Sequence, residues 1–109
     1  MLSAEGSPWL IHDDTLERTS NGSGRVGQAT DVVLQGLDAG AHLHPAFSGE
    51  PLPRLEAAAR VCRELGLCAN VEIKPARGCE VISGDVVARR VLELWAGNSL
   101  PLLSSFSEV

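Results

Sequence analysis

The sequence predicts a parallel α/β fold with about three parallel strands and flanking helices. The predicted elements follow the order strand, loop and helix, helix, strand, helix, strand along the 109 residues. The predicted strands are apolar on both faces instead of alternating, which is typical of parallel strands covered by helices on both sides. Three such strands would leave two open edges with unpaired backbone groups, so we interpret the chain as a segment of a larger parallel α/β fold.

The composition is that of an ordinary globular protein and excludes several classes. Apolar residues make up 44% of the chain and charged residues 21%, which excludes a disordered acidic tail. The net charge is −5 and the basic residues are dispersed, so we expect no nucleic-acid partner, because such a binder needs a positive face. No apolar run approaches the ~18 residues that a membrane span needs, and no signal peptide is visible.

The three cysteines, Cys62, Cys68 and Cys79, indicate a reducing compartment. An odd number of cysteines without close pairs argues against a secreted disulfide framework, so we expect a cytoplasmic protein. A zinc site built from these three is disfavoured, because structural zinc usually takes four ligands in close pairs.

The first predicted strand is the apolar run at residues 8–12, which ends in polar residues and carries His12 at its carboxyl end. The polar, glycine-rich residues 13–24 follow as a long loop, and loops of this length are often functional. Thr30 then caps a short predicted helix that runs to about Leu37.

The middle of the chain is predicted to form an ordered loop and then a helix. Residues 39–53 combine glycines and prolines with apolar anchors, which favours the loop. Residues 54–65 place apolar side chains at helical spacing, with Pro53 near the start, where a missing N–H is tolerated. Gly66 is a plausible C-terminal stop for this helix.

Two further strands and one helix complete the predicted order. Residues 68–73 read as a strand that Lys74 and Pro75 close. Ser83 is the predicted cap of a helix over about residues 85–96, whose valine and leucine spacing indicates one buried face. Residues 100–106 read as the last strand.

Polar side chains follow each predicted strand, at His12, at Glu72 and Lys74, and at residues 104–106. Active sites of parallel α/β folds lie at the carboxyl ends of the strands. Glu72 and Lys74 are two residues apart, so they project to the same side of a strand. Together they could hold a divalent cation and a phosphate oxygen, and an ordinary ion pair at a strand end is an equally open interpretation.

The histidines leave alternatives open at this point. His12 has the ordinary pKa of ~6.5 that suits a general acid or base, but a structural histidine is the commoner role for an isolated one. His42 and His44 have the spacing of a chelating pair, yet they lie in a loop with no third ligand nearby, so a role in the loop is favoured over metal binding.

Five ordered segments resemble the glycerophosphodiester phosphodiesterase family. The first is residues 11–24, IHDDTLERTSNGSG, which closely resembles a hallmark of that family. Four more matches follow in the expected order and together span essentially the whole chain: LDAG at 37–40, FSGEPLPRL at 47–55, VEIKP at 71–75 and SSF at 104–106.

The resemblance implies a partial TIM-type (β/α) barrel that hydrolyses glycerophosphodiesters to glycerol 3-phosphate and an alcohol. It also implies a divalent metal ion, Ca²⁺ or Mg²⁺, as cofactor. His12 matches the second of two family histidines that act as the acid–base pair. Glu72 matches a metal-ligand glutamate, and Lys74 matches a lysine that faces the phosphate.

Other family motifs have no counterpart in the chain. The histidine-arginine-glycine motif with the first catalytic histidine is absent, and so is a Glu-x-Asp pair with two more metal ligands. A complete barrel has ~250 residues. We therefore expect residues 1–109 to be a partial domain that lacks the N-terminal strands and the C-terminal half of the barrel, holds the metal poorly and is inactive alone. The alternative is a non-catalytic remnant or interaction subunit of the same ancestry.

Overall fold

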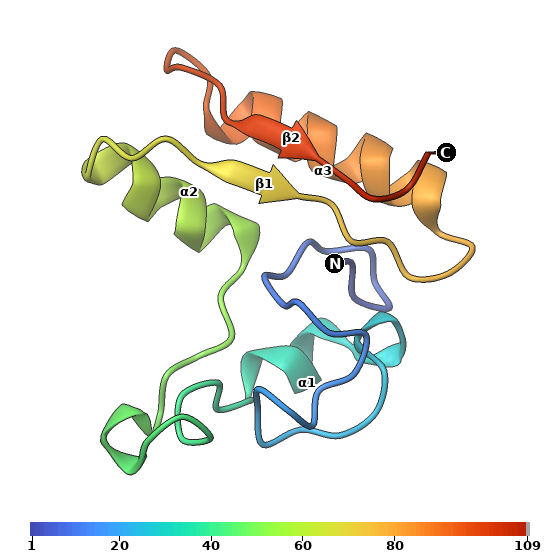
Figure 1. Ribbon diagram of the computed structural model, residues 1–109, viewed down its shortest axis with the longest axis vertical. Coiled ribbons are helices and arrows are strands. Elements are labelled where there is room, and N and C mark those ends of the chain that lie inside the picture. Colours follow the sequence, from blue (N-terminus) through green and yellow to red (C-terminus); the bar gives the residue numbers. More distant parts are fainter. Residues whose placement is uncertain (109) are drawn as a thin grey trace.

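The computed structural model describes residues 1–108 and contains three α-helices and two short β-strands (Figure 1). Two 3-10 helices lie in the loops of the N-terminal half. In chain order the elements are the 3-10 helix Val26–Gln28, α1 (Asp31–Gln35), the 3-10 helix Pro45–Phe47, α2 (Leu55–Glu64), β1 (Asn70–Glu72), α3 (Glu80–Leu94) and β2 (Leu102–Ser104).

The two strands pair in parallel, with Glu72 of β1 opposite Ser104 of β2. Helix α3 connects them and lies behind β2 in the view of Figure 1. Strand, crossover helix and parallel strand form the βαβ unit that joins neighbouring parallel strands. This unit confirms the parallel pairing predicted for the last two strands.

The predicted strand at residues 8–12 is wrong, so the described sheet has two strands and not three. Pro8 and Trp9 form only isolated antiparallel bridges, with Leu2 and Arg54 respectively. Proline lacks the N–H that a ladder needs, which limits pairing at this point. The apolar character of the segment instead reflects burial of the Trp9 side chain, which is 2% exposed.

The first two helices begin and end largely as predicted. Thr30 caps α1, since its hydroxyl accepts a hydrogen bond from the N–H of Val33 at 3.3 Å. Helix α2 begins at Leu55, directly after Pro53 and Arg54. Gly66 follows its end with a φ of +64°, a conformation that glycine adopts without a steric penalty.

Helix α3 begins earlier than predicted, at Glu80, and Ser83 is not its cap. The N–H of Ser83 donates to the carbonyl of Cys79 at 2.9 Å, so Ser83 already lies within the helix. Its side chain faces the interior and is 1% exposed. The Glu80 carboxylate accepts from the N–H of Gly78, which places an acid at the positive end of the helix and favours the earlier start.

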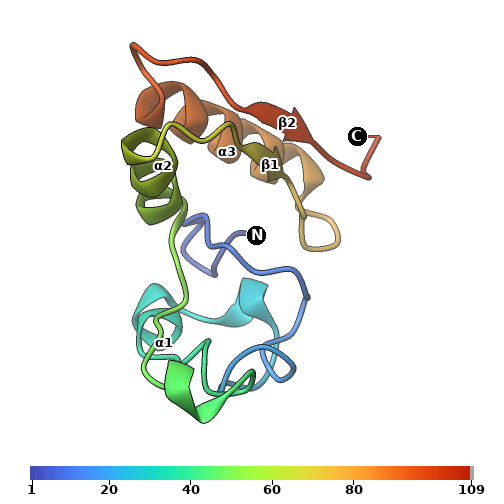
Figure 2. The same cartoon turned by 60° about the vertical axis from the view of Figure 1, so that its left-hand side comes forward.

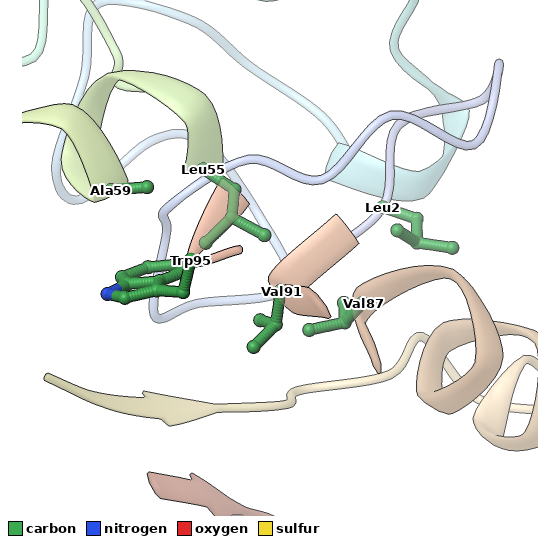
Figure 3. Packing of buried hydrophobic residues seen from close by; sticks show 6 residues of the cluster. All are labelled: Leu2, Leu55, Ala59, Val87, Val91 and Trp95. Carbon is green, nitrogen blue, oxygen red and sulfur yellow. The ribbon is translucent and has the colours of Figure 1, made fainter. Parts of the chain in front are cut away.

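Two separate clusters of buried side chains hold the structure together. Side chains of α2, α3 and the N-terminal segment (residues 1–12) meet in the helix cluster, which Figure 3 shows: Leu2, Leu55, Ala59, Val87, Val91 and Trp95. The loop cluster lies around α1 and contains Trp9, Leu16, Val26, Leu34 and Leu52.

The N-terminal segment joins the two clusters. Leu2 belongs to the helix cluster and Trp9 to the loop cluster, and the segment lies between the strands and α1 in both views (Figures 1 and 2). No helix within residues 1–108 is both long and apolar enough to cross a membrane.

Candidate functional site

His12 lies at the end of the N-terminal segment, and its imidazole is held by one neighbour. Nδ1 of His12 is 2.9 Å from Oδ1 of Asp13. Arg18 donates two hydrogen bonds to the same carboxylate, from Nε at 2.7 Å and from the guanidinium NH2 group at 2.8 Å. Asp13 is therefore shared between the imidazole and the guanidinium.

These hydrogen bonds fix the charge of Asp13. The bond from Arg18, followed by the one from His12, holds the pKa of Asp13 well below its usual range. Asp13 is thus a carboxylate at neutral pH and can only accept, so Nδ1 of His12 is the donor. That leaves Nε2 as the ring atom of His12 free to take or give a proton.

Glu72 and Lys74 are placed by the pairing of β1 with β2. The N–H of Ile73 donates to the carbonyl of Ser104 at 2.7 Å, and the hydroxyl of Ser105 donates to the carbonyl of Ile73 at 3.0 Å. With both backbone groups of Ile73 bound, its two neighbours project to the same side. Nζ of Lys74 lies 3.7 Å from Oε1 of Glu72.

The three residues singled out from the sequence line common cavities. A cavity of about 510 Å³ between the N-terminal segment, α2 and β1 has a mostly apolar lining and includes His12, Glu72 and Lys74. A smaller one, of about 200 Å³, is lined by the same three residues and also by Asp14 and Ser105. The segment 8–12, strand β1 and the residues directly after β1 therefore bring these side chains to one place.

The described residues do not make a complete metal site. Within residues 1–108 there is no group of three or more His, Cys, Asp or Glu side chains arranged to hold an ion. The carboxylate of Glu72 is paired with Lys74. Calcium takes ~6–8 oxygen ligands, so Glu72 alone would leave most positions to water.

Sequence reasoning missed the partners of His12. Asp13 and Arg18 lie in the same loop and are joined by two hydrogen bonds. The only feature of the sequence that pointed to this ion pair was the presence of two opposite charges in that loop. His44, by contrast, has a local role, since its Nδ1 accepts from the N–H of Ala46 at 3.1 Å and so caps the 3-10 helix Pro45–Phe47.

Comparison with known proteins shows similarity to one family of phosphodiesterases. The sequence pattern of the Glycerophosphoryl diester phosphodiesterase family matches residues 1–100. The YhdW protein of Bacillus subtilis is 45% identical over 82 residues, which are 73% of this chain and 34% of that protein. The chain thus spans about a third of the length of the curated relatives that it matches.

Solved structures show the same similarity across nearly the whole chain. A phosphodiesterase from Oleispira antarctica, in complex with the product sn-glycerol-3-phosphate, superposes with a TM-score of 0.92 and 34% identity, over 99% of this chain and 44% of that one. A glycerophosphodiester phosphodiesterase from Agrobacterium tumefaciens gives a TM-score of 0.76 and 32% identity, over 99% of this chain and 43% of that one.

Proposed function

Because the chain belongs to the glycerophosphoryl diester phosphodiesterase family, we propose that its site serves the hydrolysis of glycerophosphodiesters to glycerol 3-phosphate and an alcohol. The observation that carries the proposal is the common cavity of His12, Glu72 and Lys74. A cationic ammonium, a carboxylate and an acid–base imidazole around one cavity suit a phosphodiester. The similar phosphodiesterase that contains sn-glycerol-3-phosphate supports the same substrate class.

The proposed chemistry divides between two side chains. The ammonium group of Lys74 offsets the negative charge of the phosphodiester and positions it. His12 exchanges a proton at Nε2, while Nδ1 stays bound to Asp13. General acid–base catalysis of this kind contributes typically about 10²–10⁴-fold to a rate.

A divalent ion, Ca²⁺ or Mg²⁺, would find only Glu72 as its family-type ligand in this chain. Because the described residues do not complete such a site, we propose that the ion is held poorly. The chain also lacks the first histidine and the two further ligands that the family resemblance implies. We therefore propose that the chain by itself turns over substrate slowly or not at all.

The fold and location proposals rest on separate observations. The unit of β1, α3 and β2, together with the similarity to larger phosphodiesterase structures, supports residues 1–109 as a partial TIM-type barrel domain. The thiols of Cys62, Cys68 and Cys79 are all free, which supports the cytoplasm as the location.

The test is calorimetric binding of sn-glycerol 3-phosphate to the purified chain, paired with an assay of glycerol 3-phosphate release from glycerophosphocholine in added Ca²⁺ or Mg²⁺. We expect saturable binding that Lys74→Ala weakens about tenfold, as for loss of one charge-assisted contact. Arg60→Ala, at an exposed position on α2, is the matched control and leaves binding unchanged.

The two measurements separate the parts of the proposal. Absence of binding, or binding that is insensitive to Lys74→Ala, overturns the assigned site. Turnover comparable with a full-length relative contradicts the inactivity of the chain, and His12→Ala should then lower it by about 10²–10⁴-fold. Binding without turnover is the expected result, and it would equally describe a non-catalytic member of the family.

A further inference from the structure

A third cavity, of about 200 Å³, adjoins the candidate site and carries two arginines. Its lining includes Asp14, Arg25 and Arg77, and we call it the arginine cavity. Asp14 also lines the small cavity of His12, Glu72 and Lys74. Asp14 is thus common to the linings of the two cavities, which places them next to each other.

The backbone at Arg25 is fixed by pairing with the loop that carries Asp14. Arg25 forms an antiparallel bridge with Thr15. On either side, the N–H of Val26 donates to the carbonyl of Asp14 at 2.9 Å, and the N–H of Leu16 donates to the carbonyl of Gly24 at 3.0 Å. The wall formed by Asp14 and Arg25 is therefore held by backbone hydrogen bonds.

Arg77 reaches the cavity from the loop between β1 and α3. A turn in which the N–H of Cys79 donates to the carbonyl of Ala76 at 2.9 Å shapes this loop. The two loops touch at small residues, since a Cβ added at Gly27 would lie 3.5 Å from the Cβ of Ala76. This close approach brings two arginines that are distant in sequence to one cavity.

Neither arginine of the cavity is neutralised by an ion pair. Within residues 1–108, the arginines that form ion pairs with an aspartate or glutamate are Arg18, Arg89 and Arg90. Of the nearby acids, Asp14 lines the cavity itself. Glu80 interacts electrostatically with Arg77, but its carboxylate is hydrogen-bonded to the N–H of Gly78. The charged side chains of the lining are therefore two guanidinium groups and one carboxylate, and the N-terminal residue Met1, whose ammonium group donates to the carbonyl of Trp9, lines it as well.

We propose that the arginine cavity binds a carboxylate on the alcohol part of a glycerophosphodiester, an inference that rests on the proposed function for the phosphodiester itself. Guanidinium groups match the planar geometry of a carboxylate and bind it with paired hydrogen bonds. Asp14 repels a doubly charged phosphate monoester more strongly than a single carboxylate, and it can accept from an ammonium group beside that carboxylate. The preferred alcohol is thus one of the amino-acid type.

The experiment compares the affinity of the purified chain for two probes by calorimetry. Glycerophosphoserine carries the carboxylate and the ammonium group, and glycerophosphoethanolamine carries only the ammonium group. We expect glycerophosphoserine to bind about tenfold more tightly, which corresponds to about 1.4 kcal/mol. Arg25→Gln and Arg77→Gln should each remove most of this preference, while Arg60→Gln on α2 keeps it.

The outcomes distinguish this inference from the proposed function. Equal affinity for the two probes, or a preference that survives both arginine substitutions, overturns the carboxylate site. If Lys74→Ala weakens both probes alike, the phosphodiester site stands whatever the arginines do. If neither probe binds, both proposals fail. A loss of preference that Arg60→Gln reproduces would indicate general charge attraction and also overturns the inference.

Discussion

The imidazole of His12 and the carboxylate of Asp13 are joined by a 2.9 Å contact, and Arg18 holds that carboxylate with two further hydrogen bonds. Arg18 thereby fixes the carboxylate that orients the imidazole ring. The consequence is a defined ring orientation in a residue that is otherwise largely exposed. Hydrogen bonds of this kind hold an acid–base side chain on a loop in one orientation.

Asp13→Asn should change the tautomer of His12. A carboxylate can only accept, whereas the amide of asparagine can also donate to Nδ1, so the population with the proton on Nδ1 should fall. The ¹⁵N chemical shifts of the neutral imidazole measure this population. Asp14→Asn is the neighbouring control, and it should leave the tautomer as it is. An unchanged ratio in Asp13→Asn would show that the contact does not select the tautomer.

Asp31 should make stability depend on acid pH. Hydrogen bonds from Ser3, then Ser7 and Trp9, hold the pKa of its carboxyl well below the ordinary value of about 3.9. Because the folded state prefers the ionised form, this stabilisation is present above that ordinary value and is lost as the pH falls towards the depressed folded pKa. The free energy of unfolding should therefore decrease as the pH falls below about 4.

Urea unfolding of Asp31→Asn at a series of pH values tests this coupling. At pH 6 we expect a loss of about 1–2 kcal/mol, as for hydrogen bonds to a charged group that is partly solvated. The loss should shrink in acid. Asp85→Asn removes an exposed pair with Arg89 and should cost at most about 0.5 kcal/mol. A loss of constant size at every pH would rule out the ionisation of Asp31 as its cause.

The elements predicted correctly from the sequence are those that local patterns determine. Thr30 before an apolar helical run defines the start of α1, and strand periodicity puts Glu72 and Lys74 on one side. The segment 8–12 was misread because an apolar run does not show which partner will cover it. The same reason applies to Ser83, whose hydroxyl turned out to face the interior instead of the helix end.

The parts of the site that could not be predicted depend on loops meeting in space. The pairing of Asp13 with Arg18 requires a particular loop conformation, and the arginine cavity requires the segment around Arg25 to touch the loop of Arg77. No spacing rule links such positions in a single sequence. Family resemblance supplied the residues of the site, and only the structure supplied their neighbours.

Leu34→Ala should strongly destabilise the loop cluster, although α1 is only a short helix. The side chain of Leu34 is 0% exposed, and removing a buried leucine side chain costs about 2–5 kcal/mol. Val32→Ala lies in the same helix at 80% exposure and should change the free energy of unfolding by less than about 0.5 kcal/mol. Urea unfolding followed by tryptophan fluorescence compares them. Equal effects would mean that α1 does not contribute to a packed core.

Gly40→Ala should disrupt the loop that Asp38 closes. The carboxylate of Asp38 accepts from the N–H groups of Gly40 and Ala41 and from that of Gly49 across the loop. A Cβ at Gly40 would lie 2.0 Å from the carbonyl oxygen of Phe47, which is backbone and cannot rotate away. Relieving that overlap requires a backbone shift, for which overpacked sites show a cost of about 1–3 kcal/mol or more.

Gly36→Ala is the matched control for this loop substitution. Gly36 has a φ of −84°, and its nearest contact for an added Cβ is 3.7 Å, so alanine fits there. Alanine also reduces the entropy of the unfolded chain, and we expect a gain of about 0.4–1 kcal/mol. Thermal or urea unfolding of both variants should therefore give effects of opposite sign. If Gly40→Ala is tolerated as well as Gly36→Ala, the loop adapts and its closure by Asp38 is not tightly constrained.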